Sequence, residues 1–323
     1  MALLLPACVS FPDAPQATAP PMLAGNAVRS MDGAQLGLQS WPAEHPKAII
    51  LALHGMNDYS GAFAPAGTWW AEHAQITTYA LDQRGFGRSP DFGRWAGGDT
   101  LIADLRAALA AVHGTHPGLP VFVVGHSMGA AVVMAAQAEA PLAADGLVLA
   151  APGVWGGRAL PFPYRLTLNM AASFAPGKTL TGERTERQAT DNIDILRAMV
   201  RDPLVIKQTR LDAVLGVVRI MGRAYGEADK VEGDILFLIG EKDEIIPLKA
   251  MEKAARRVSG ETDVRRYEDG WHLLFRDKQA ETVWRDVAAW IDARSALIET
   301  PRVSLADRPA AFQSASAILQ TAR

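Results

Sequence analysis

Hydrophobic positions along the chain fall into two kinds of segment, and the two kinds alternate over most of its length. Continuous apolar runs are typical of strands buried on both faces, whereas apolar residues three or four positions apart are typical of helices packed on one side. The strand candidates are Ala48–Leu53, Ile76–Leu81, Pro120–Val124, Gly146–Leu149, Ile235–Ile239 and Val264–Tyr267. The helix candidates are Trp69–Ala74, Thr100–Val112, Ser127–Ala140, Pro247–Val258 and Lys278–Leu297. This alternation predicts an α/β fold with a mostly parallel central sheet flanked by helices.

Two regions depart from the alternation. Ala27–Trp41 contains two short segments around a Met-Asp-Gly turn, which predicts a hairpin. From Gly153 to Asp229 no strand candidate occurs, and prolines divide the region into short helical segments. The predicted organisation is listed by residue number: N-terminal segment 1–26, α/β core 27–152 and 230–298, helical cap (lid) 153–229, and C-terminal tail 299–323, with a candidate short helix at Ala310–Leu319.

The composition excludes several classes of protein. Hydrophobic residues make up 49% and charged residues 21% of the chain, as in ordinary globular proteins. The net charge of -3 contains no basic excess that would neutralise phosphates, so nucleic acid is not an expected partner. The single cysteine excludes an intramolecular disulfide and a cysteine-rich zinc site. No run of about 18 apolar residues occurs, so no segment is expected to span a bilayer.

The first residues carry a separate signal. Leu5-Pro6-Ala7-Cys8 resembles a bacterial lipobox, and Ser10–Pro21 is rich in Pro and Ala, as a tether is. This interpretation predicts a lipoprotein anchored through Cys8 on the periplasmic side of a bacterial membrane. However, the segment lacks a basic region, and its apolar stretch is short for a signal peptide. The alternative is an incidental cysteine in a frayed terminus of a cytoplasmic protein.

The strongest motif is Gly125-His126-Ser127-Met128-Gly129, which lies between a strand candidate and a helix candidate. In this context a G-x-S-x-G sequence is typical of a nucleophile elbow, a strained turn that lifts the serine Oγ above the carboxyl edge of the sheet. A side chain at Gly125 or Gly129 would clash with neighbouring backbone. The turn also points the following N–H groups at a developing oxyanion. Ser127 is therefore the candidate nucleophile.

A serine nucleophile needs a base that accepts its proton and an acid that orients the base. On this kind of fold the acid and then the histidine follow the serine along the chain. The chain contains seven histidines, and only His272 follows the last strand candidate. His126 adjoins Ser127, but neighbouring side chains on an elbow point apart. We therefore expect His272 to be the base.

Three motifs occur in a fixed order: His54-Gly55-Met56 after the third strand, Asp82 to Ser89 after the fourth, and Gly125 to Gly129 after the fifth. In this order they resemble the monoacylglycerol lipase and lysophospholipase branch of the α/β-hydrolases, a serine aminopeptidase S33-type group. The resemblance extends more loosely through Asp202-Pro203-Leu204 and covers most of Ala27–Leu297. It implies the α/β-hydrolase fold, with a helical cap inserted in the core.

The resemblance also implies a catalytic acid. It places this acid at Asp243, in the loop that follows the strand Ile235–Ile239. Glu241 and Glu244 share the loop and are local competitors. Asp269 lies too near His272 in the chain to approach its Nδ1 easily.

The oxyanion hole implied by the resemblance consists of the backbone N–H groups of Met56 and Met128. Gly55 belongs with Gly125 and Gly129 to the glycines of these turns. We expect the side chain of His54 to hold local backbone rather than to react. Arg84 is expected to join loops through its several donors.

Substrate specificity is expected in the cap. Leu166, Met170 and Phe174 recur at helical spacing, and Leu211, Leu215 and Val218 repeat the pattern. One interpretation is an apolar acyl-chain tunnel over Ser127, with the first three residues binding substrate. The other is that these residues pack the cap onto the core. Pro161 to Tyr164 is a candidate apolar lip that contacts a lipid surface.

The predicted function is a serine hydrolase that cleaves carboxylic esters of a single-acyl-chain lipid, a monoacylglycerol or lysophospholipid, through an acyl-serine intermediate. No cofactor or metal is expected. The expected partner is a small lipid ester, with membrane-surface contact through the cap or an acylated Cys8. The alternatives are a thioesterase or peptidase that uses the same three residues, and a non-catalytic, membrane-tethered binding protein of the same fold.

Overall fold

A nine-stranded sheet lies at the centre of the structure, which is a computed structural model describing residues 9–181 and 187–299, without the side chains of 297–299. Cys8 and Ala310–Leu319 lie outside the described residues. The strand order is β1-β2-β3-β5-β4-β6-β7-β10-β11. The strands are β1 (Met22–Ala24), β2 (Ala27–Arg29), β3 (Gln35–Trp41), β4 (Ala48–Leu53), β5 (Ile76–Leu81), β6 (Val121–His126), β7 (Gly146–Ala150), β10 (Asp234–Gly240) and β11 (Glu261–Tyr267).

The hydrophobic pattern predicted the parallel part of this sheet. Strands β5, β4, β6, β7, β10 and β11 pair in parallel, and β4 and β6 are buried at every position, as continuous apolar runs require. The predicted hairpin is also confirmed, because β2 and β3 pair antiparallel with Val28 opposite Leu36. Strand β1 was not predicted, since three residues are too few to show a period.

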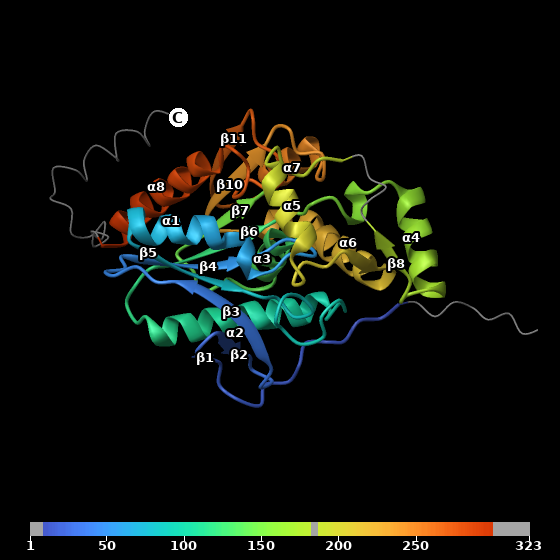
Figure 1. The fold of residues 1–323 in the computed structure, drawn as a ribbon, viewed down its shortest axis with the longest axis horizontal. Helices are drawn as coiled ribbons and strands as arrows, with labels where there is room; N and C mark the ends of the chain where they lie inside the picture. Colours follow the sequence, from blue (N-terminus) through green and yellow to red (C-terminus); the bar gives the residue numbers. More distant parts are fainter. Residues whose placement is uncertain (1–8, 182–186, 300–323) are drawn as a thin grey trace, which may run out of the picture.

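Helices cover both faces of the sheet (Figure 1). Helices α1 (Ala64–Ala74) and α8 (Ala280–Glu299) pack on one face, and α2 (Gly98–Thr115), α3 (Met128–Glu139) and α7 (Leu248–Ala255) pack on the other. The predicted helices are therefore confirmed, with shifted ends. Helix α1 begins well before Trp69, because Pro65 occupies its first turn, where a proline favours helix initiation.

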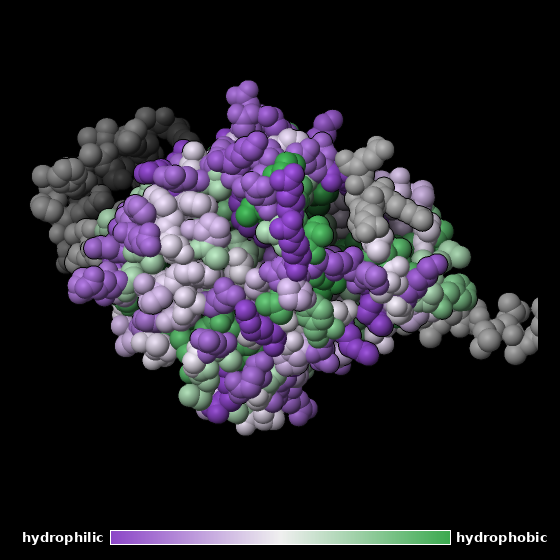
Figure 2. Space-filling view, in the orientation of Figure 1, coloured by the Kyte–Doolittle hydropathy of each residue, from purple (hydrophilic) through white to green (hydrophobic). Residues whose placement is uncertain are grey.

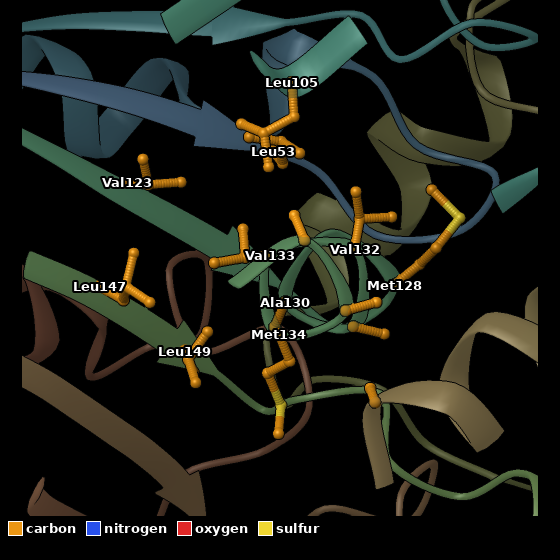
Figure 3. Close-up of a cluster of buried hydrophobic side chains, with 14 of the residues drawn as sticks. Leu53, Leu105, Val123, Met128, Ala130, Val132, Val133, Met134, Leu147 and Leu149 are labelled. Carbon is orange, nitrogen blue, oxygen red and sulfur yellow. The ribbon is translucent and has the colours of Figure 1, made fainter. Parts of the chain in front are cut away.

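The larger of two core layers lies between the sheet and helices α2 and α3. Figure 3 shows Leu53, Val123 and Leu149 of β4, β6 and β7 in one cluster with side chains of α3, among them Ala130, Val133 and Met134. Helix α3 is buried over its first nine residues, from Met128 to Ala136. Its many alanines let it lie close to the strands, and this close approach sets the position of the turn that precedes it.

The region between β7 and β10 contains short strands as well as helices. Its elements are η2 (Gly157–Ala159), α4 (Phe162–Phe174), β8 (Thr179–Thr181), α5 (Ile193–Arg201), β9 (Gln208–Arg210), α6 (Leu211–Gly226) and η4 (Ala228–Lys230). The expectation of an all-helical insertion was wrong, because β8 and β9 pair as an antiparallel ribbon. The pattern missed them since each has three residues and neither has an apolar alternation.

Residues 9–21, which we call the strap, lie against the body of the protein. The rings of Phe11 and Trp95 meet edge to face with their centroids 6.4 Å apart, and the guanidinium carbon of Arg219 in α6 lies 5.3 Å from the centroid of the Phe11 ring. Arg219 also donates to the carbonyl oxygen of Val9 at 2.8 Å. The segment predicted as a tether is thus attached to α6. Among the described helices, none is long and apolar enough to cross a membrane.

Candidate active site

Ser127 lies on the sharp turn between β6 and α3. Its φ of 52° and ψ of -113° are unfavourable for a residue with a Cβ, and the side chain is nearly buried. The flanking glycines explain how the turn is possible. A Cβ on Gly125 would lie 2.5 Å from Ala130 Cα, and one on Gly129 would lie 2.3 Å from the carbonyl oxygen of Leu53. The predicted backbone clash at both glycines is therefore confirmed.

Three side chains predicted from the sequence form a hydrogen-bonded row at this turn. Nε2 of His272 lies 2.9 Å from Ser127 Oγ, and Nδ1 of His272 lies 2.8 Å from Asp243 Oδ2. Asp243 follows β10 and His272 follows β11, so parallel strands bring all three to one sheet edge. If Nδ1–H donates to the carboxylate, Nε2 is free to accept the serine proton.

Asp243 is held in one orientation. Its side chain is fully buried, and Oδ1 accepts hydrogen bonds from the N–H groups of Ile245 at 2.8 Å and Ile246 at 2.9 Å. The other oxygen is left for His272. A carboxylate with this many donors remains a fixed acceptor for the imidazole.

The competing carboxylates are bound elsewhere. Glu241 pairs with Arg266 at 3.0 Å, and Glu244 accepts from the N–H of Gln188 at 2.7 Å. Asp269 pairs with Lys242 at 2.5 Å. None of the three bonds to His272, so the structure brings Asp243 alone of this group to the imidazole.

A second histidine supports the first, and sequence reasoning did not find this role. His126 Nε2 lies 2.9 Å from the carbonyl oxygen of His272, so this nitrogen carries the proton and donates. Burial, together with the nearby His272, lowers the pKa of His126 to about 3. The ring therefore stays neutral and holds the backbone of His272. The only signal for this role was its place beside Ser127.

The β4 loop, which we define as residues 54–59, lies beside the serine. A Cβ on Gly55 would lie 3.3 Å from Ser127 Cβ. Within the described residues, neither Met56 N–H nor Met128 N–H donates a hydrogen bond. Met128 is also the first residue of α3, whose dipole favours negative charge at that end. These two amides are thus available to an anion.

His54 has the structural role expected of it. Its Nδ1 donates to the carbonyl oxygen of Gly55 at 2.8 Å, and its Nε2 accepts from the N–H of Gln83 at 3.0 Å. Burial lowers its pKa, so the ring remains neutral. Arg84 also behaves as expected, because it joins Asp32 at 2.7 Å to Asp104 at 2.8 Å.

A buried ion pair that the sequence did not reveal connects the β4 loop to the loop after His272. Asp58 Oδ2 pairs with Arg276 Nη2, and both side chains are buried. The two residues are 218 positions apart, so no local pattern marks them. A buried pair of this kind is costly to break, because a lone charge would remain in the interior.

The predicted acyl-binding residues lie on α4 but are not enclosed. Leu166, Met170 and Phe174 are 48%, 51% and 67% exposed, whereas Ala172 faces inward. Figure 2 shows apolar surface over this helix. The three side chains therefore form an open stripe, and they are not the wall of a closed tunnel in this structure. Leu211 and Leu215 are buried against the inner face of α4, so they pack two helices of the predicted cap together and do not attach the cap to the main core.

A cavity of about 690 Å³ lies apart from this site, between the strap and the loop that contains Trp95. Its lining includes none of the three residues of the row. Two of the three arginines that line it, Arg84 and Arg210, are paired with carboxylates. In the part of the chain that the structure describes, no cluster of three or more His, Cys, Asp or Glu side chains is arranged to hold a metal ion.

The fold and this site define the class of the protein as an α/β-hydrolase, with a Ser-His-Asp row at the carboxyl edge of a mostly parallel sheet. The sequence profile described as "Serine aminopeptidase, S33" matches residues 44–279. The chain therefore belongs to this family, which confirms the resemblance inferred from the three motifs.

Related proteins that are named as lipases support the same class. A monoacylglycerol lipase of Mycolicibacterium smegmatis is 25% identical over 280 residues, which cover 80% of this chain and 93% of the relative. The human monoglyceride lipase is 25% identical over 284 residues, covering 83% of this chain and 90% of the relative. Together with the family, these relatives identify the chain as a carboxylic ester hydrolase.

Solved structures confirm the fold. A soluble variant of the monoglyceride lipase from Saccharomyces cerevisiae superposes with a TM-score of 0.71 at 19% identity, covering 88% of this chain and 99% of the other. The monoacylglycerol lipase of Paleococcus ferrophilus gives a TM-score of 0.69 at 20% identity, with coverages of 80% and 99%.

Proposed function

We propose that Ser127, His272 and Asp243 form a catalytic triad that hydrolyses a carboxylic ester through an acyl-serine intermediate. The observation that carries the proposal is the continuous hydrogen-bonded row from Asp243 Oδ2 to Ser127 Oγ, at 2.8 Å and 2.9 Å. The strained backbone of Ser127 supports it, because such strain persists mainly where a site requires it.

The reaction has two halves. Ser127 Oγ attacks the ester carbonyl carbon while its proton passes to His272 Nε2, and Asp243 stabilises the imidazolium. The amides of Met56 and Met128 bind the oxyanion of the tetrahedral intermediate. When the intermediate collapses, the alcohol leaves with the proton from His272. Water then attacks the acyl-serine by the same route and releases the acid and free Ser127.

The substrate class that we propose is an ester with one fatty acyl chain, a monoacylglycerol or a lysophospholipid. Two full-length relatives named as lipases of monoacylglycerol or monoglyceride support this choice. The apolar stripe of α4, which includes Leu166 and Met170, supports it from the side of this chain, since an acyl chain needs an apolar surface.

The test compares wild type with Ser127→Ala on a monoacylglycerol, a lysophospholipid and p-nitrophenyl esters of several lengths. We expect kcat to fall on the order of 10⁶-fold in the variant. A fluorophosphonate probe should label wild type and leave Ser127→Ala unlabelled. Glu241→Gln is the matched control, because Glu241 pairs with Arg266 at the surface and should leave kcat unchanged. Turnover that survives in Ser127→Ala would contradict the proposal.

The alternatives are separated in the same assay. A thioesterase or a peptidase would prefer an acyl thioester or an aminoacyl amide over every oxygen ester in the panel, although it would use the same triad. A non-catalytic binding protein would show neither turnover nor labelling by the probe.

We further propose that the start of α4 contacts a lipid surface. Phe162 and Tyr164 are 64% and 67% exposed on a helix that carries further exposed apolar residues. The double variant Phe162→Ser, Tyr164→Ser should bind liposomes several-fold more weakly than wild type in a flotation assay. Val264→Ser is the control, because Val264 is 45% exposed on β11. Equal flotation of wild type and the double variant would count against lipid contact.

A further inference from the structure

The orientation of the Met56 amide depends on the carbonyl group in the same peptide plane, which is that of Gly55. This carbonyl oxygen accepts two hydrogen bonds, from His54 Nδ1 at 2.8 Å and from the N–H of Asp58 at 3.3 Å. Because a peptide unit is planar, anything that holds the Gly55 oxygen also directs the Met56 N–H. The position of Asp58 is therefore part of the geometry of this amide.

The residues on either side of Asp58 are bound by the insertion. The hydroxyl of Tyr59 donates to Asp202 Oδ2 at 2.8 Å. The carbonyl oxygen of Asn57 accepts from the N–H of Ile206 at 2.9 Å, and its Nδ2 donates to Thr209 Oγ1 at 2.7 Å. Three hydrogen bonds thus connect the β4 loop to residues 202–209, and each of them has Asn57 or Tyr59 as the partner in the loop.

Asp58 itself is bound by the core through its buried ion pair with Arg276. Asn57 and Tyr59 therefore bind the insertion, while Asp58 between them binds the core. The backbone of Asn57 has a φ of 66°, a left-handed conformation that asparagine tolerates but that still needs support from its surroundings. Its two contacts with Ile206 and Thr209 supply that support.

We propose that Asn57 and Tyr59 are positioning residues that couple docking of residues 202–209 to the orientation of the Met56 amide. The oxyanion site is then complete only while this part of the insertion is docked. The inference rests on the proposed function, in which Met56 N–H binds the oxyanion. On this proposal the insertion helps to orient the oxyanion site and also provides a surface for the substrate.

Two isosteric changes test the coupling. Tyr59→Phe removes the bond to Asp202, and Thr209→Val removes the acceptor for Asn57. Each should lower kcat for p-nitrophenyl acetate about three- to tenfold with KM changed less than twofold, and the double variant should lose more. Because the acetyl group is too short to need an acyl-binding surface, a loss of kcat with this substrate reports a change in the β4 loop. Binding of a trifluoromethyl ketone, whose serine adduct carries an oxyanion, should weaken in parallel.

The matched control is Thr179→Val. Thr179 Oγ1 lies 3.3 Å from Gln208 Oε1 within the β8–β9 ribbon, and among the described residues neither side chain forms a hydrogen bond with the β4 loop. This variant should keep the kcat of wild type. Urea midpoints of all variants, measured alongside, identify any loss that follows from unfolding.

The coupling is overturned if both variants turn over the acetate at the wild-type rate, or if their losses are confined to long-chain esters. The second result would assign residues 202–209 to acyl binding alone. Ser127→Ala, assayed in parallel, separates this outcome from failure of the proposed function. If Ser127→Ala retains turnover, the triad assignment fails, whatever Tyr59→Phe does. If only Ser127→Ala loses activity, the triad assignment stands and the coupling fails.

Discussion

Two histidines lie side by side at the site, and their surroundings give them different roles. The ring centres of His126 and His272 are 5.1 Å apart. His272 bonds to Ser127 on one side and to Asp243 on the other, so both of its nitrogens belong to the row. His126 donates its one ring proton to the carbonyl oxygen of His272, and burial keeps the ring neutral. Chain order was enough to select His272 as the base, but it did not show that His126 holds the backbone of His272.

The neutral state of His126 predicts a dependence of stability on pH. Its pKa falls from 6.5 in an exposed histidine to about 3 in the folded protein. Between these values the unfolded chain binds a proton that the folded chain does not. Stability from this group is therefore complete above pH 6.5 and is lost as the pH falls toward 3, by up to about 1.4 kcal/mol per pH unit.

The variant His126→Gln isolates this effect, because its side-chain amide can still donate to His272 O but does not titrate. The free energy of unfolding in urea should fall less steeply between pH 7 and pH 5 in His126→Gln than in wild type. His54, whose pKa is also lowered, remains in both proteins and cancels in the comparison. Parallel pH dependences would show that His126 is not held neutral in the folded state.

At the scale of elements, the site depends on how closely α3 approaches the strands. The first turn of α3 touches the end of β4, where a Cβ on Gly129 would lie 2.3 Å from Leu53 O and 2.7 Å from Leu53 C. Backbone atoms cannot move aside as the end of a flexible side chain can. The elbow therefore requires glycine at this position because of packing between two elements.

Gly129→Ala should lower the free energy of unfolding by about 2 kcal/mol or more and reduce kcat, since α3 must shift away from β4. Gly114→Ala is the matched control, because Gly114 is also helical and a Cβ there would meet no atom within 4 Å. This change should raise stability by about 0.5–1 kcal/mol. Urea denaturation and esterase assays measure both effects. Equal midpoints for Gly129→Ala and wild type would refute the packing argument.

Elements were predictable from the sequence where burial imposed a period. Strand β4 has six apolar residues in succession, all buried, and the sequence pattern placed its ends correctly. Strands β8 and β9 have three residues each and no apolar alternation, so only their pairing defines them. The stripe of α4 had the correct spacing, but spacing does not say whether a helical face meets protein or solvent.

At the scale of the whole molecule, α6 joins the insertion to the core. Near its start, Leu211 and Leu215 pack against α4, whereas Ile220 and Ala224 further along belong to the main core. Arg223 adds ion pairs from α6 to Asp99 of α2 and to Glu139 of α3, at 2.9 Å and 2.6 Å. The second half of α6 is thus part of the core, although it falls within the predicted cap at 153–229.

The strap reinforces this arrangement. It is attached to α6 through Arg219, and its Phe11 lies against Trp95 in the loop before α2. The Pro and Ala content of residues 9–21 predicts an extended segment, but it does not predict which part of the protein the segment contacts. The strap therefore runs along the protein and reaches the insertion, where Val9 packs beside Leu211 and Leu215.

The sequence by itself determined the alternation of strands and helices, the elbow around Ser127 and the order in which a carboxylate and His272 follow it. These features are readable because burial imposes a period on neighbouring residues, and because a tight turn restricts the residues within it. The resemblance of the motifs to a known family also indicated Asp243, and the structure places that carboxylate, ahead of its neighbours in the loop, against His272. Only the tertiary structure showed that His126 holds the backbone of His272, that Asp58 pairs with Arg276 and that Tyr59 bonds to Asp202. The last two contacts join residues 218 and 143 positions apart, and such pairs form when the folded sheet and insertion bring their loops together, so no local pattern records them.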